Sequence, residues 1–598
     1  CDHICTERCV RNFFDAPLGI REIKRFAFEH SRAPREQAGA PKGVRVAIVG
    51  AGPAGISAAY YLAKAGFEAE LFEAKANPGG MVGGAVPRYR LEDKAREVDL
   101  ERLRQLGVKL HLGKALGRDV SLDALRRDYA YLFLGVGAQK GKNLGIEGEE
   151  AAGVLDALVF LDRIRGEASP ELGKRVLVVG GGNSAMDAAR SARRTAKGAQ
   201  VSLVYRRTRP EMPADPEEVR DCLLEGIELK ELLAPTRVVV EAGKVVGLAC
   251  TRMVLGERDG SGRPRPVPSG DPEVVLPADT IIPAIGQETV LDFLGGLELK
   301  RHRNGTLVVD PETCETSVSG VFAGGDVARG PASVIKAIAD GRAAAEAIGR
   351  RHGVPSLQEP VLAKGIPATA LLEKKARKVA AQTVPVLPVG ERGGFDQVLH
   401  GFGLEAAVAE ASRCLDCDEM CSLCVTVCPN RANRAYALEP LALELPELVV
   451  RAGKAVPQGT RSIRIEQGIQ TLNIGDFCNE CGNCATFCPT AGAPYRDKPR
   501  FWIDAEGFAE AQGNAFRFER RGEDLVLEAK LDGQAHRLEL KGDTAEYRSE
   551  LLRARFEAGT WCFLGAEILG GVEGQVLDLA PCATMIALLG AREAFPTA

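Results

Sequence analysis

Continuous apolar runs that end in glycine recur through the first two thirds of the chain. The first run, Val46–Val49, is followed by glycines spaced as G-x-G-x-x-G and then by a helix-like stretch that reaches Leu62. A short run without polar residues predicts a strand buried in a parallel sheet, and this glycine spacing predicts a tight turn into a helix. The same pattern predicts further strands at residues 69–73, 131–138, 175–179, 199–207, 280–286 and 320–326.

The C-terminal tail, residues 497–598, has a different pattern. Apolar and polar residues alternate in FRFERR, LVLEAKL and HRLELKG. Alternation with a period of two predicts strands with one buried face. We expect a small β-rich module with a helix at its end, and the tail shows no recognisable chemistry.

The glycines after the first run predict a dinucleotide site. The first glycine makes the tight turn, the second lets the backbone approach a pyrophosphate, and the third lets helix and strand pack closely. An acid about 20 residues further on holds a ribose in this motif, and Glu73 stands there at the end of its strand. Either FAD or NAD fits such a site. We expect cofactor contacts at Gly50, Gly52, Pro53, Ala54, Gly55 and Glu73.

Other small residues are candidates for the same site. A glycine-rich loop at residues 77–91 includes Gly80 and Met81 and allows close backbone approach, although a mobile surface loop is the alternative. The strand at 131–138 ends in Gly135 and Gly137. Gly325 and Asp326 follow another strand and precede a long amphipathic helix, where the acid suits a sugar-alcohol hydroxyl and the helix N-terminus suits a reduced flavin.

A second strand–glycine–helix unit begins at Arg175. Its glycines follow the G-x-G-x-x-A variant, and the next strand ends in Arg206 and Arg207 instead of an acid. An acid would repel a 2′-phosphate, whereas a guanidinium binds it with two hydrogen bonds, so the pair favours NADP over NAD. A solvated arginine pair is the alternative. We expect contacts at Gly180, Gly182, Asn183, Ser184, Ala185, Arg206, Arg207 and Gly286.

Cysteines cluster in two regions. Of 17 cysteines, three lie at positions 1–9 and nine lie between 414 and 488. Short-spaced cysteines in a chain without a secretion signal indicate metal ligands. We interpret the other five as small core residues or inert thiols: Cys222, Cys250, Cys314, Cys562 and Cys582.

The N-terminal cysteines are Cys1, Cys5 and Cys9. Thiolates so close together favour iron–sulfur ligation, and a shared helical face without metal is the alternative. The fourth ligand would lie upstream of Cys1. Because the chain opens inside this motif and without Met, we expect it to be the C-terminal part of a longer protein.

The C-terminal cysteines form two ferredoxin-like runs. The second run is C-x2-C-x2-C-x3-C-P, the spacing in which three cysteines hold one [4Fe–4S] cubane and the fourth holds another. Zinc is the alternative. We assign a first ligand set of Cys417, Cys421, Cys424 and Cys488, and a second ligand set of Cys428, Cys478, Cys481 and Cys484. Cys414 is the spare, unless it replaces Cys417.

Residues 1 to about 352 resemble the small subunit of bacterial glutamate synthase and the NADPH half of dihydropyrimidine dehydrogenase. The likeness is carried by VAIVGAGPAG, VVGGGNSAMD, VYRRTRPEMP and VFAGGDVARG, in the family's order. It implies FAD on the first fold, NADPH on the second, and N-terminal [4Fe–4S] clusters beside the flavin. The N-terminal cysteines depart from the family's spacing. The whole arrangement also resembles a large iron–sulfur flavoprotein family described as selenate reductase subunits, although no residue here indicates a selenate site.

The expected fold is α/β, with two nested Rossmann-like dinucleotide-binding domains and a C-terminal two-cluster ferredoxin-like domain. The predicted parts are an iron–sulfur helical segment and linker (1–42), an FAD-binding domain in two pieces (43–165 and 299–352), an inserted NADPH-binding domain (166–298), a linker with helices (353–413), the ferredoxin-like domain (414–496) and the β-rich tail (497–598).

These features predict an electron-transfer oxidoreductase. NADPH would reduce the flavin directly, so we name no catalytic side chain, and the clusters would pass single electrons to a partner redox protein, which the likeness suggests is a molybdenum-containing one. One alternative is a self-contained reductase with its substrate domain upstream. The other is a non-catalytic electron-transfer subunit that is inactive until it binds a partner oxidoreductase. The net charge of −4 gives no reason to expect a nucleic acid partner. Without a membrane-length apolar run or signal peptide, we expect a cytoplasmic protein.

Overall fold

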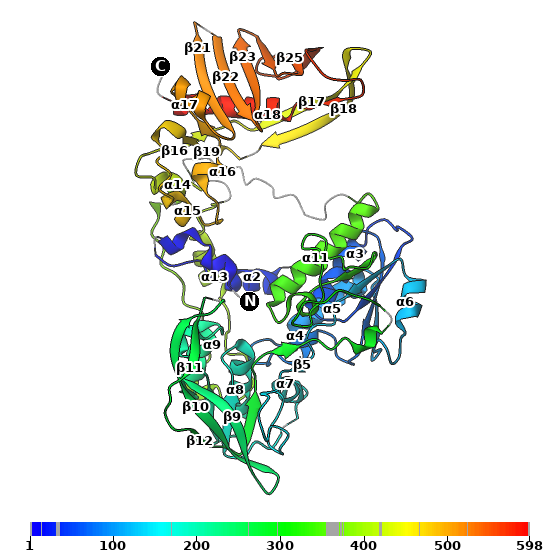
Figure 1. Ribbon diagram of the computed structural model, residues 1–598, viewed down its shortest axis with the longest axis vertical. Coiled ribbons are helices and arrows are strands. Elements are labelled where there is room, and N and C mark those ends of the chain that lie inside the picture. Colours follow the sequence, from blue (N-terminus) through cyan, green and yellow to red (C-terminus); the bar gives the residue numbers. More distant parts are fainter. Residues whose placement is uncertain are drawn as a thin grey trace. The chain divides into compact units, whose positions relative to one another are not determined.

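The chain folds into two compact units, seen in the computed structural model of Figure 1. The structure describes residues 3–13, 15–31, 36–168, 170–260, 262–295, 297–354, 370, 373–374, 376–417, 421–465, 467–522 and 524–595. One unit, the nucleotide unit, comprises Arg25–Glu359 and Thr383–Phe402. The other, the cysteine unit, comprises His3–Lys24, Pro360–Gln382 and Gly403–Ala598. The segment expected as a linker at 353–413 is therefore divided between the two units.

The first fold of the nucleotide unit is a parallel five-stranded sheet in the order β15-β4-β1-β2-β3. Its central strand β1 is apolar and buried after Arg45 because neighbours pair with it on both sides, β2 and β4, all in parallel. The predicted strands at 46–49 and 69–73 are confirmed, those at 131–138 and 320–326 are shorter than predicted, and β3 was not predicted. The strands are β1 (Arg45–Val49), β2 (Glu68–Glu73), β3 (Lys109–Leu112), β4 (Tyr131–Leu134) and β15 (Val321–Ala323).

Helices α3 and α11 pack against each other beside this sheet (Figure 1). Their facing residues are small: a Cβ on Gly341 of α11 would lie 2.2 Å from the carbonyl oxygen of Ala54 in α3. Only glycine permits so close an approach of two helix backbones. The helices of this fold are α3 (Pro53–Lys64), α4 (Gly80–Gly84), α5 (Asp93–Gln105), α6 (Leu122–Asp128), α10 (Asp326–Arg329) and α11 (Val334–Arg351).

The second fold is inserted between β4 and β15, as predicted from the order of the motifs. Its parallel sheet has the order β13-β6-β7-β8, and a separate antiparallel sheet is built around the long strand β10. The parallel strands are β6 (Arg175–Val179), β7 (Gln200–Val204), β8 (Glu228–Lys230) and β13 (Thr280–Pro283). The antiparallel strands are β9 (Leu233–Glu241), β10 (Lys244–Arg258), β11 (Pro264–Pro268) and β12 (Val274–Pro277). The helices are α7 (Ala157–Arg165), α8 (Asn183–Thr195) and α9 (Pro216–Leu224).

Two short strands connect these folds. β5 (Lys140–Gly141) leaves the first fold and pairs in antiparallel fashion with β14 (Gln287–Glu288), which returns from the second. The chain therefore crosses between the two folds twice, at one two-stranded ribbon.

A nine-stranded sheet dominates the cysteine unit, in the order β16-β19-β20-β21-β22-β23-β24-β25-β26. It joins strands from the cysteine-rich segment to the predicted tail, so the predicted boundary at residue 497 is corrected: no separate β-rich module begins there. Apolar side chains on one face of the sheet bury themselves against α18 (Ala580–Leu588), which contacts β22 and β23 (Figure 1). The strands are β16 (Asn433–Ala437), β19 (Ile469–Ile474), β20 (Arg500–Phe501), β21 (Ala515–Arg521), β22 (Asp524–Leu531), β23 (Gln534–Lys541), β24 (Thr544–Arg548), β25 (Leu552–Glu557) and β26 (Phe563–Ile568).

The two cysteine runs flank a long hairpin of β17 (Leu441–Arg451) and β18 (Lys454–Ile465), which pairs further with β27 (Val576–Leu577). The short helices of this unit are α1 (Ile4–Glu7), α14 (Leu423–Thr426), α15 (Asn483–Thr486), α16 (Pro494–Asp497) and α17 (Ala505–Glu510). Longer helices are α13 (Leu404–Ser412) and α2 (Ile20–His30), the second of which passes from one unit into the other. Among the described residues, no helix has the length and apolar character required to cross a bilayer.

Candidate functional sites

The first glycine turn has the geometry of a phosphate cradle. Gly50 has φ 102°, and a Cβ there would lie 2.4 Å from the carbonyl oxygen of Gly135. A Cβ on Gly55 would lie 1.9 Å from the carbonyl oxygen of Gly50, so helix and strand touch at this point. By contrast, a Cβ on Gly52 would have no neighbour closer than 3.9 Å, and helix α3 begins at the next residue. The open position at Gly52 and the free N–H groups of the helix fit a pyrophosphate.

The glycine-rich loop lies directly beside this cradle. A Cβ on Gly80 would lie 2.8 Å from the Cα of Gly52, and the Gly79 N–H donates to the carbonyl oxygen of Ala51 at 2.8 Å. Met81 follows in the short helix α4 and is half-buried. These contacts hold the loop next to the first glycine turn, and its role in binding the cofactor stays a prediction.

Glu73 ends β2 next to the same turn and is 9% exposed. Its carboxylate accepts hydrogen bonds from the N–H groups of Ala51 and Lys75, both at 2.8 Å. These bonds hold the carboxylate at the sheet edge, and each oxygen retains acceptor capacity for a ribose hydroxyl. The position fits the predicted ribose contact.

Gly135 and Gly325 lie at the same edge of the first parallel sheet as the first glycine turn. They follow β4 and β15, whose carboxyl ends lie beside that of β1 because the strands are parallel. Asp326 begins α10; burial raises its pKa, while the Ala332 N–H that donates to its carboxylate at 3.1 Å lowers it. Gly137 has φ 68°, and Gly325 has φ 74°, conformations that favour glycine.

Asp340 is a site residue that the sequence did not indicate. It is 2% exposed and accepts from the Gly325 N–H at 2.9 Å and from Arg329 at 2.5 Å. The aspartate thus fixes the backbone at the predicted flavin contact. An acid inside an amphipathic helix, fifteen residues after Gly325, carries no pattern that would have revealed this role.

The second glycine turn repeats the geometry. Gly180 has φ 148°, and a Cβ there would lie 2.3 Å from the carbonyl oxygen of Ala284. A Cβ on Gly182 would meet nothing within 4 Å, and helix α8 begins at Asn183. Behind the turn, Ala185 is fully buried. Ser184 is half-buried and Gly286 exposed, the latter after the carboxyl end of β13, which pairs in parallel with β6. The turn fits a second dinucleotide.

The two arginines after β7 have different roles, which corrects the expectation that both bind a 2′-phosphate. Arg207 is 4% exposed; its Nε donates to the carbonyl oxygen of Pro264, and its Nη2 donates to Asp259, both at 2.7 Å. These bonds tie the strand end to the β10–β11 hairpin. Arg206 is exposed. Arg206 alone is therefore placed to contact a phosphate from solvent.

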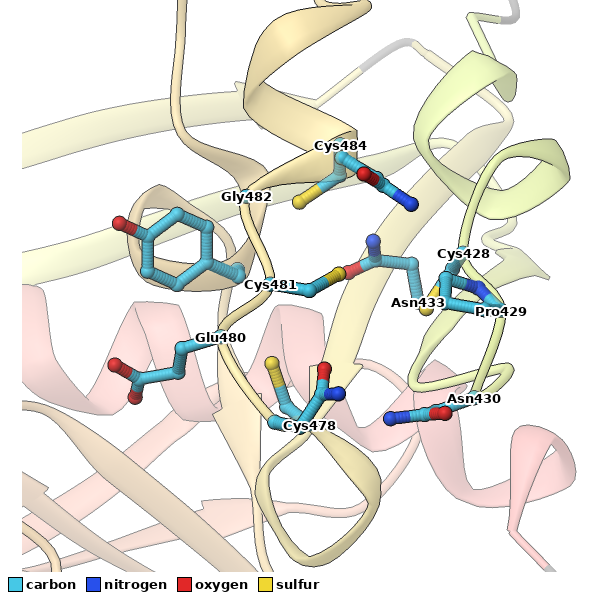
Figure 2. A pocket seen from close by; sticks show the side chains of 12 residues that line it. Cys428, Pro429, Asn430, Asn433, Cys478, Glu480, Cys481, Gly482 and Cys484 are labelled. Atoms are coloured by element: carbon cyan, nitrogen blue, oxygen red, sulfur yellow. The ribbon is translucent and has the colours of Figure 1, made fainter.

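The second ligand set lines one pocket. Figure 2 shows the sulfur atoms of Cys478, Cys481 and Cys484 directed into a space that Cys428 borders from the opposite side. Cys428 comes from the first cysteine run and the other three from the second, as the two-cluster spacing predicts. The remaining lining residues are mostly polar: Pro429, Asn430, Asn433, Asn479, Glu480, Gly482, Asn483 and Tyr495.

The first ligand set is more enclosed. Cys417 and Cys421 pack against an apolar cluster formed by Val10, Leu415 and Leu423. Burial, helped by the nearby Cys421, raises the pKa of the Cys424 thiol to about 11. Lys498 acts electrostatically on both Cys424 and Cys488, so these two thiols lie near the same cation.

Hydrogen bonds reach two of the sulfur atoms. The Ala432 N–H donates to Cys428 Sγ at 3.2 Å, and the Gly492 N–H donates to Cys488 Sγ at 3.3 Å. The Thr490 hydroxyl also lies 3.2 Å from Cys488 Sγ. For the free Cys488 thiol, burial raises the pKa, but these bonds outweigh it and leave the pKa lowered. Donors of this kind suit thiolates that bind iron.

The N-terminal motif is described in part. Cys5 lies in α1 and Cys9 two residues beyond its end, both half-buried, whereas Cys1 lies outside the described residues. Cys414 is directed at Asp416, with 3.9 Å between sulfur and carboxylate oxygen. In the described part of the chain, no three Cys, His, Asp or Glu side chains are arranged to hold a single metal ion. A cubane differs from such a site because each of its four thiolates binds a different iron atom.

The chain is similar in sequence to known proteins. Residues 44–341 match the pyridine nucleotide-disulphide oxidoreductase family. The NADP(+)-dependent formate dehydrogenase subunit beta of Moorella thermoacetica is 41% identical over 462 residues, which are 70% of this chain and 64% of that protein. YgfK of Escherichia coli O157:H7, provisionally named an oxidoreductase, is 33% identical over 541 residues, 90% of this chain and 47% of YgfK.

The NADPH glutamate synthase small chain of Escherichia coli K12 is 35% identical over 369 residues, which cover 58% of this chain and 78% of that protein. The chain spans about half to two thirds of the length of the other two relatives, 47% and 64%. Because the two glycine turns lie inside the matched region and the small chain is matched over more than two thirds of its length, this chain belongs to the glutamate synthase small-subunit-like family of NAD(P)H-dependent oxidoreductases.

Proposed function

We propose that the chain passes electrons from NADPH, through FAD and [4Fe–4S] clusters, to a partner redox protein. The observation that carries this proposal is the combination of two open glycine turns in the nucleotide unit with a four-cysteine pocket in the cysteine unit. FAD supplies the chemistry that couples hydride transfer to single-electron transfer. A glycine turn alone fits any dinucleotide enzyme, but cysteine pairs of ferredoxin spacing indicate single-electron carriers.

The residues of the nucleotide unit bind and orient the two dinucleotides. Gly52 and Gly182 leave space for phosphates, Glu73 faces the first ribose, and Arg206 is available to the second nucleotide. No side-chain acid or base is assigned to the hydride step, because the cofactors exchange hydride directly. The chain contributes the positions of the two cofactors.

The acceptor is proposed to be a protein subunit. One relative is named as the beta subunit of a formate dehydrogenase, which indicates that relatives work within larger assemblies. A molybdenum-containing oxidoreductase remains the partner class that the family likeness suggests, and selenate a terminal oxidant suggested by the same likeness. A self-contained reductase would instead need a substrate domain in addition to the units described.

The test uses the full chain, purified without oxygen, with its flavin and iron contents measured first. NADPH is supplied with a dye that accepts from flavin and, separately, with the natural partner or with selenate. We expect the Cys481→Ala, Cys484→Ala double variant to retain dye reduction and flavin content and to lose partner reduction. Cys562→Ala, at an exposed cysteine outside both ligand sets, is the matched control.

Two outcomes would contradict the proposal. If the unaltered chain contains flavin but NADPH reduces no cluster, the clusters do not accept from this flavin. If the double variant loses dye and partner reduction together while its flavin content is normal, the clusters lie before the flavin and not after it.

A further inference from the structure

We propose that the two C-terminal clusters work in a fixed order, set by what each ligand set touches. The first ligand set receives electrons from the N-terminal cysteine segment, and the second ligand set delivers them to the partner. This inference rests on the proposed function, because it assigns the direction of the same electron path. It is argued from described residues of the cysteine unit alone.

The residue that follows Cys9 indicates which cluster receives electrons from the N-terminal motif. Val10 is 7% exposed and forms a common apolar cluster with Leu415 and Leu423, against which Cys417 and Cys421 pack. The N-terminal motif is therefore one residue away from a side chain that covers two ligands of the first set. Electron transfer weakens steeply with distance, so this contact favours transfer between the N-terminal motif and the first set.

Charged residues hold the N-terminal segment in this place. The Arg11 Nη1 donates to the carbonyl oxygen of Arg413 at 2.9 Å, and the Gly19 N–H donates to Glu410 at 2.9 Å. Arg413, 1% exposed, donates to Glu410 and to the carbonyl oxygen of Ala16, both at 2.6 Å. A buried cation with several acceptors is costly to displace. The segment is thus anchored immediately before Cys414, where the first cysteine run begins.

The solvent exposure of the cysteines indicates which cluster passes electrons to the partner. Each set has one buried cysteine, Cys424 in the first and Cys484 in the second, but an exposed cysteine, Cys481, occurs only in the second. Cys417 and Cys421 of the first set pack against the apolar cluster. The pocket of the second set opens among neutral polar side chains and Glu480 (Figure 2). An acceptor protein can approach Cys481 directly, without displacing an element of this unit.

Each transfer moves one electron and forms or breaks no bond. An electron leaves the N-terminal motif for the first set, passes to the second set, and reduces a one-electron acceptor group on the partner, which restores the oxidised state of both sets. Two such passages account for the two electrons of one NADPH. The co-reactants are those that the proposed function already requires.

The test follows the two clusters separately by rapid-freeze electron paramagnetic resonance after NADPH is mixed with the full chain. In Cys421→Ala, we expect the cluster of the second set to stay oxidised over the period in which the unaltered chain reduces it, while dithionite still reduces it. In Cys481→Ala, we expect the cluster of the first set to be reduced at the unaltered rate. Cys562→Ala serves as the control.

A second variant keeps every ligand in place. Val10→Lys puts a charge into the apolar cluster, and we expect it to slow the reduction of both C-terminal clusters by NADPH while flavin reduction and iron content stay unchanged. A soluble lanthanide complex should also broaden the signal of the second set more than that of the first, because Cys481 is exposed.

The order is overturned if NADPH reduces the second set at the normal rate in Cys421→Ala, or if Cys481→Ala blocks reduction of the first. Equal broadening of both signals, or an unchanged rate in Val10→Lys, would also contradict it. Failure of the underlying function looks different: in the unaltered chain, NADPH would then reduce the flavin and neither cluster.

Discussion

Single residues decide how the two nucleotide sites differ. Glu73 ends β2 and Arg206 follows β7, so an acid stands at the strand end beside the first glycine turn and a cation at the corresponding strand end of the second fold. A free 2′-hydroxyl suits the acid, and a 2′-phosphate suits the guanidinium. Arg207 is adjacent to Arg206 in sequence, but its guanidinium donates hydrogen bonds to Asp259 and to the carbonyl oxygen of Pro264.

Replacing Arg206 should therefore separate the two roles. We expect Arg206→Ala to raise KM for NADPH and to leave KM for NADH nearly unchanged, since the loss of hydrogen bonds from a charged group to a phosphate costs about 1.5–3 kcal/mol. Arg207→Ala should lower thermal stability by loosening the β10–β11 hairpin. Steady-state kinetics with both nucleotides and thermal unfolding measure the two effects. A selective NADPH defect in Arg207→Ala alone would contradict this division.

Thr490 should tune the cluster of the first ligand set. Its hydroxyl lies 3.2 Å from Cys488 Sγ, and hydrogen bonds to ligand sulfur stabilise the reduced, more negative state. We expect Thr490→Val to lower the reduction potential of that cluster and to leave the other unchanged. Thr490→Ser retains the hydroxyl and should behave as the unaltered chain. Redox titration followed by electron paramagnetic resonance is the measurement, and equal potentials in both variants would disprove the role.

At the scale of elements, residues 383–402 act as a strap on the nucleotide unit. The Val398 N–H donates to the carbonyl oxygen of Tyr89 at 2.9 Å, and Arg194 donates to the carbonyl oxygen of Gly394 at 2.9 Å. The Tyr89 ring lies under Arg194, with 4.1 Å from guanidinium carbon to ring centroid. The strap thereby connects the loop after α4 with helix α8 of the inserted fold.

Asp187 of helix α8 accepts from Arg90, the neighbour of Tyr89 in sequence, and should make the folding stability of the chain depend on pH. Burial raises its pKa to about 6, although its ion pair with Arg90 opposes the shift. Because the pKa is higher in the folded state than in the unfolded state, the folded chain binds more protons between about pH 4 and pH 6. The stabilisation by protonated Asp187 is therefore complete below about pH 4 and is lost as the pH rises through about 6.

We therefore expect the unaltered chain to lose unfolding free energy relative to Asp187→Asn between about pH 4 and pH 7, by about 3 kcal/mol at most. The asparagine keeps the size of the side chain but cannot ionise. Denaturant unfolding across this range measures the difference. If the difference between the two proteins stays constant with pH, Asp187 does not titrate in this window.

At the scale of the whole molecule, the two units have separate apolar cores. The cores of the nucleotide unit lie around its parallel sheets, and that of the cysteine unit lies between the nine-stranded sheet and α18. Metal binding stabilises the fold that supplies the ligands. Removal of iron should therefore act on one unit only.

Calorimetry of the iron-depleted chain tests this expectation. We expect the unfolding transition of the cysteine unit to move to lower temperature and that of the nucleotide unit to stay in place. Re-addition of iron and sulfide should restore the first transition. A common shift of both transitions would show that the units unfold as one.

The sequence by itself determined the features that depend on local chemistry. The apolar run before G-x-G-x-x-G predicted β1, its turn and α3, because only glycine permits the close approach seen at Gly55. The insertion of the second fold followed from motif order. Ferredoxin spacing also predicted that Cys428 joins the second ligand set, and the four cysteines of that set line one pocket.

The tertiary structure decided what depends on contacts between distant residues. Arg206 and Arg207 are chemically identical and adjacent. Only the position of the β10–β11 hairpin shows that it is Arg207 whose guanidinium pairs with Asp259. The nine-stranded sheet crosses the predicted boundary at residue 497 because edge-to-edge pairing of β20 with β19 and β21 leaves no sequence signal. Likewise, Val10 reaches Cys417 and Cys421 across some 400 residues of chain, a proximity that apolar packing creates and that local pattern cannot express.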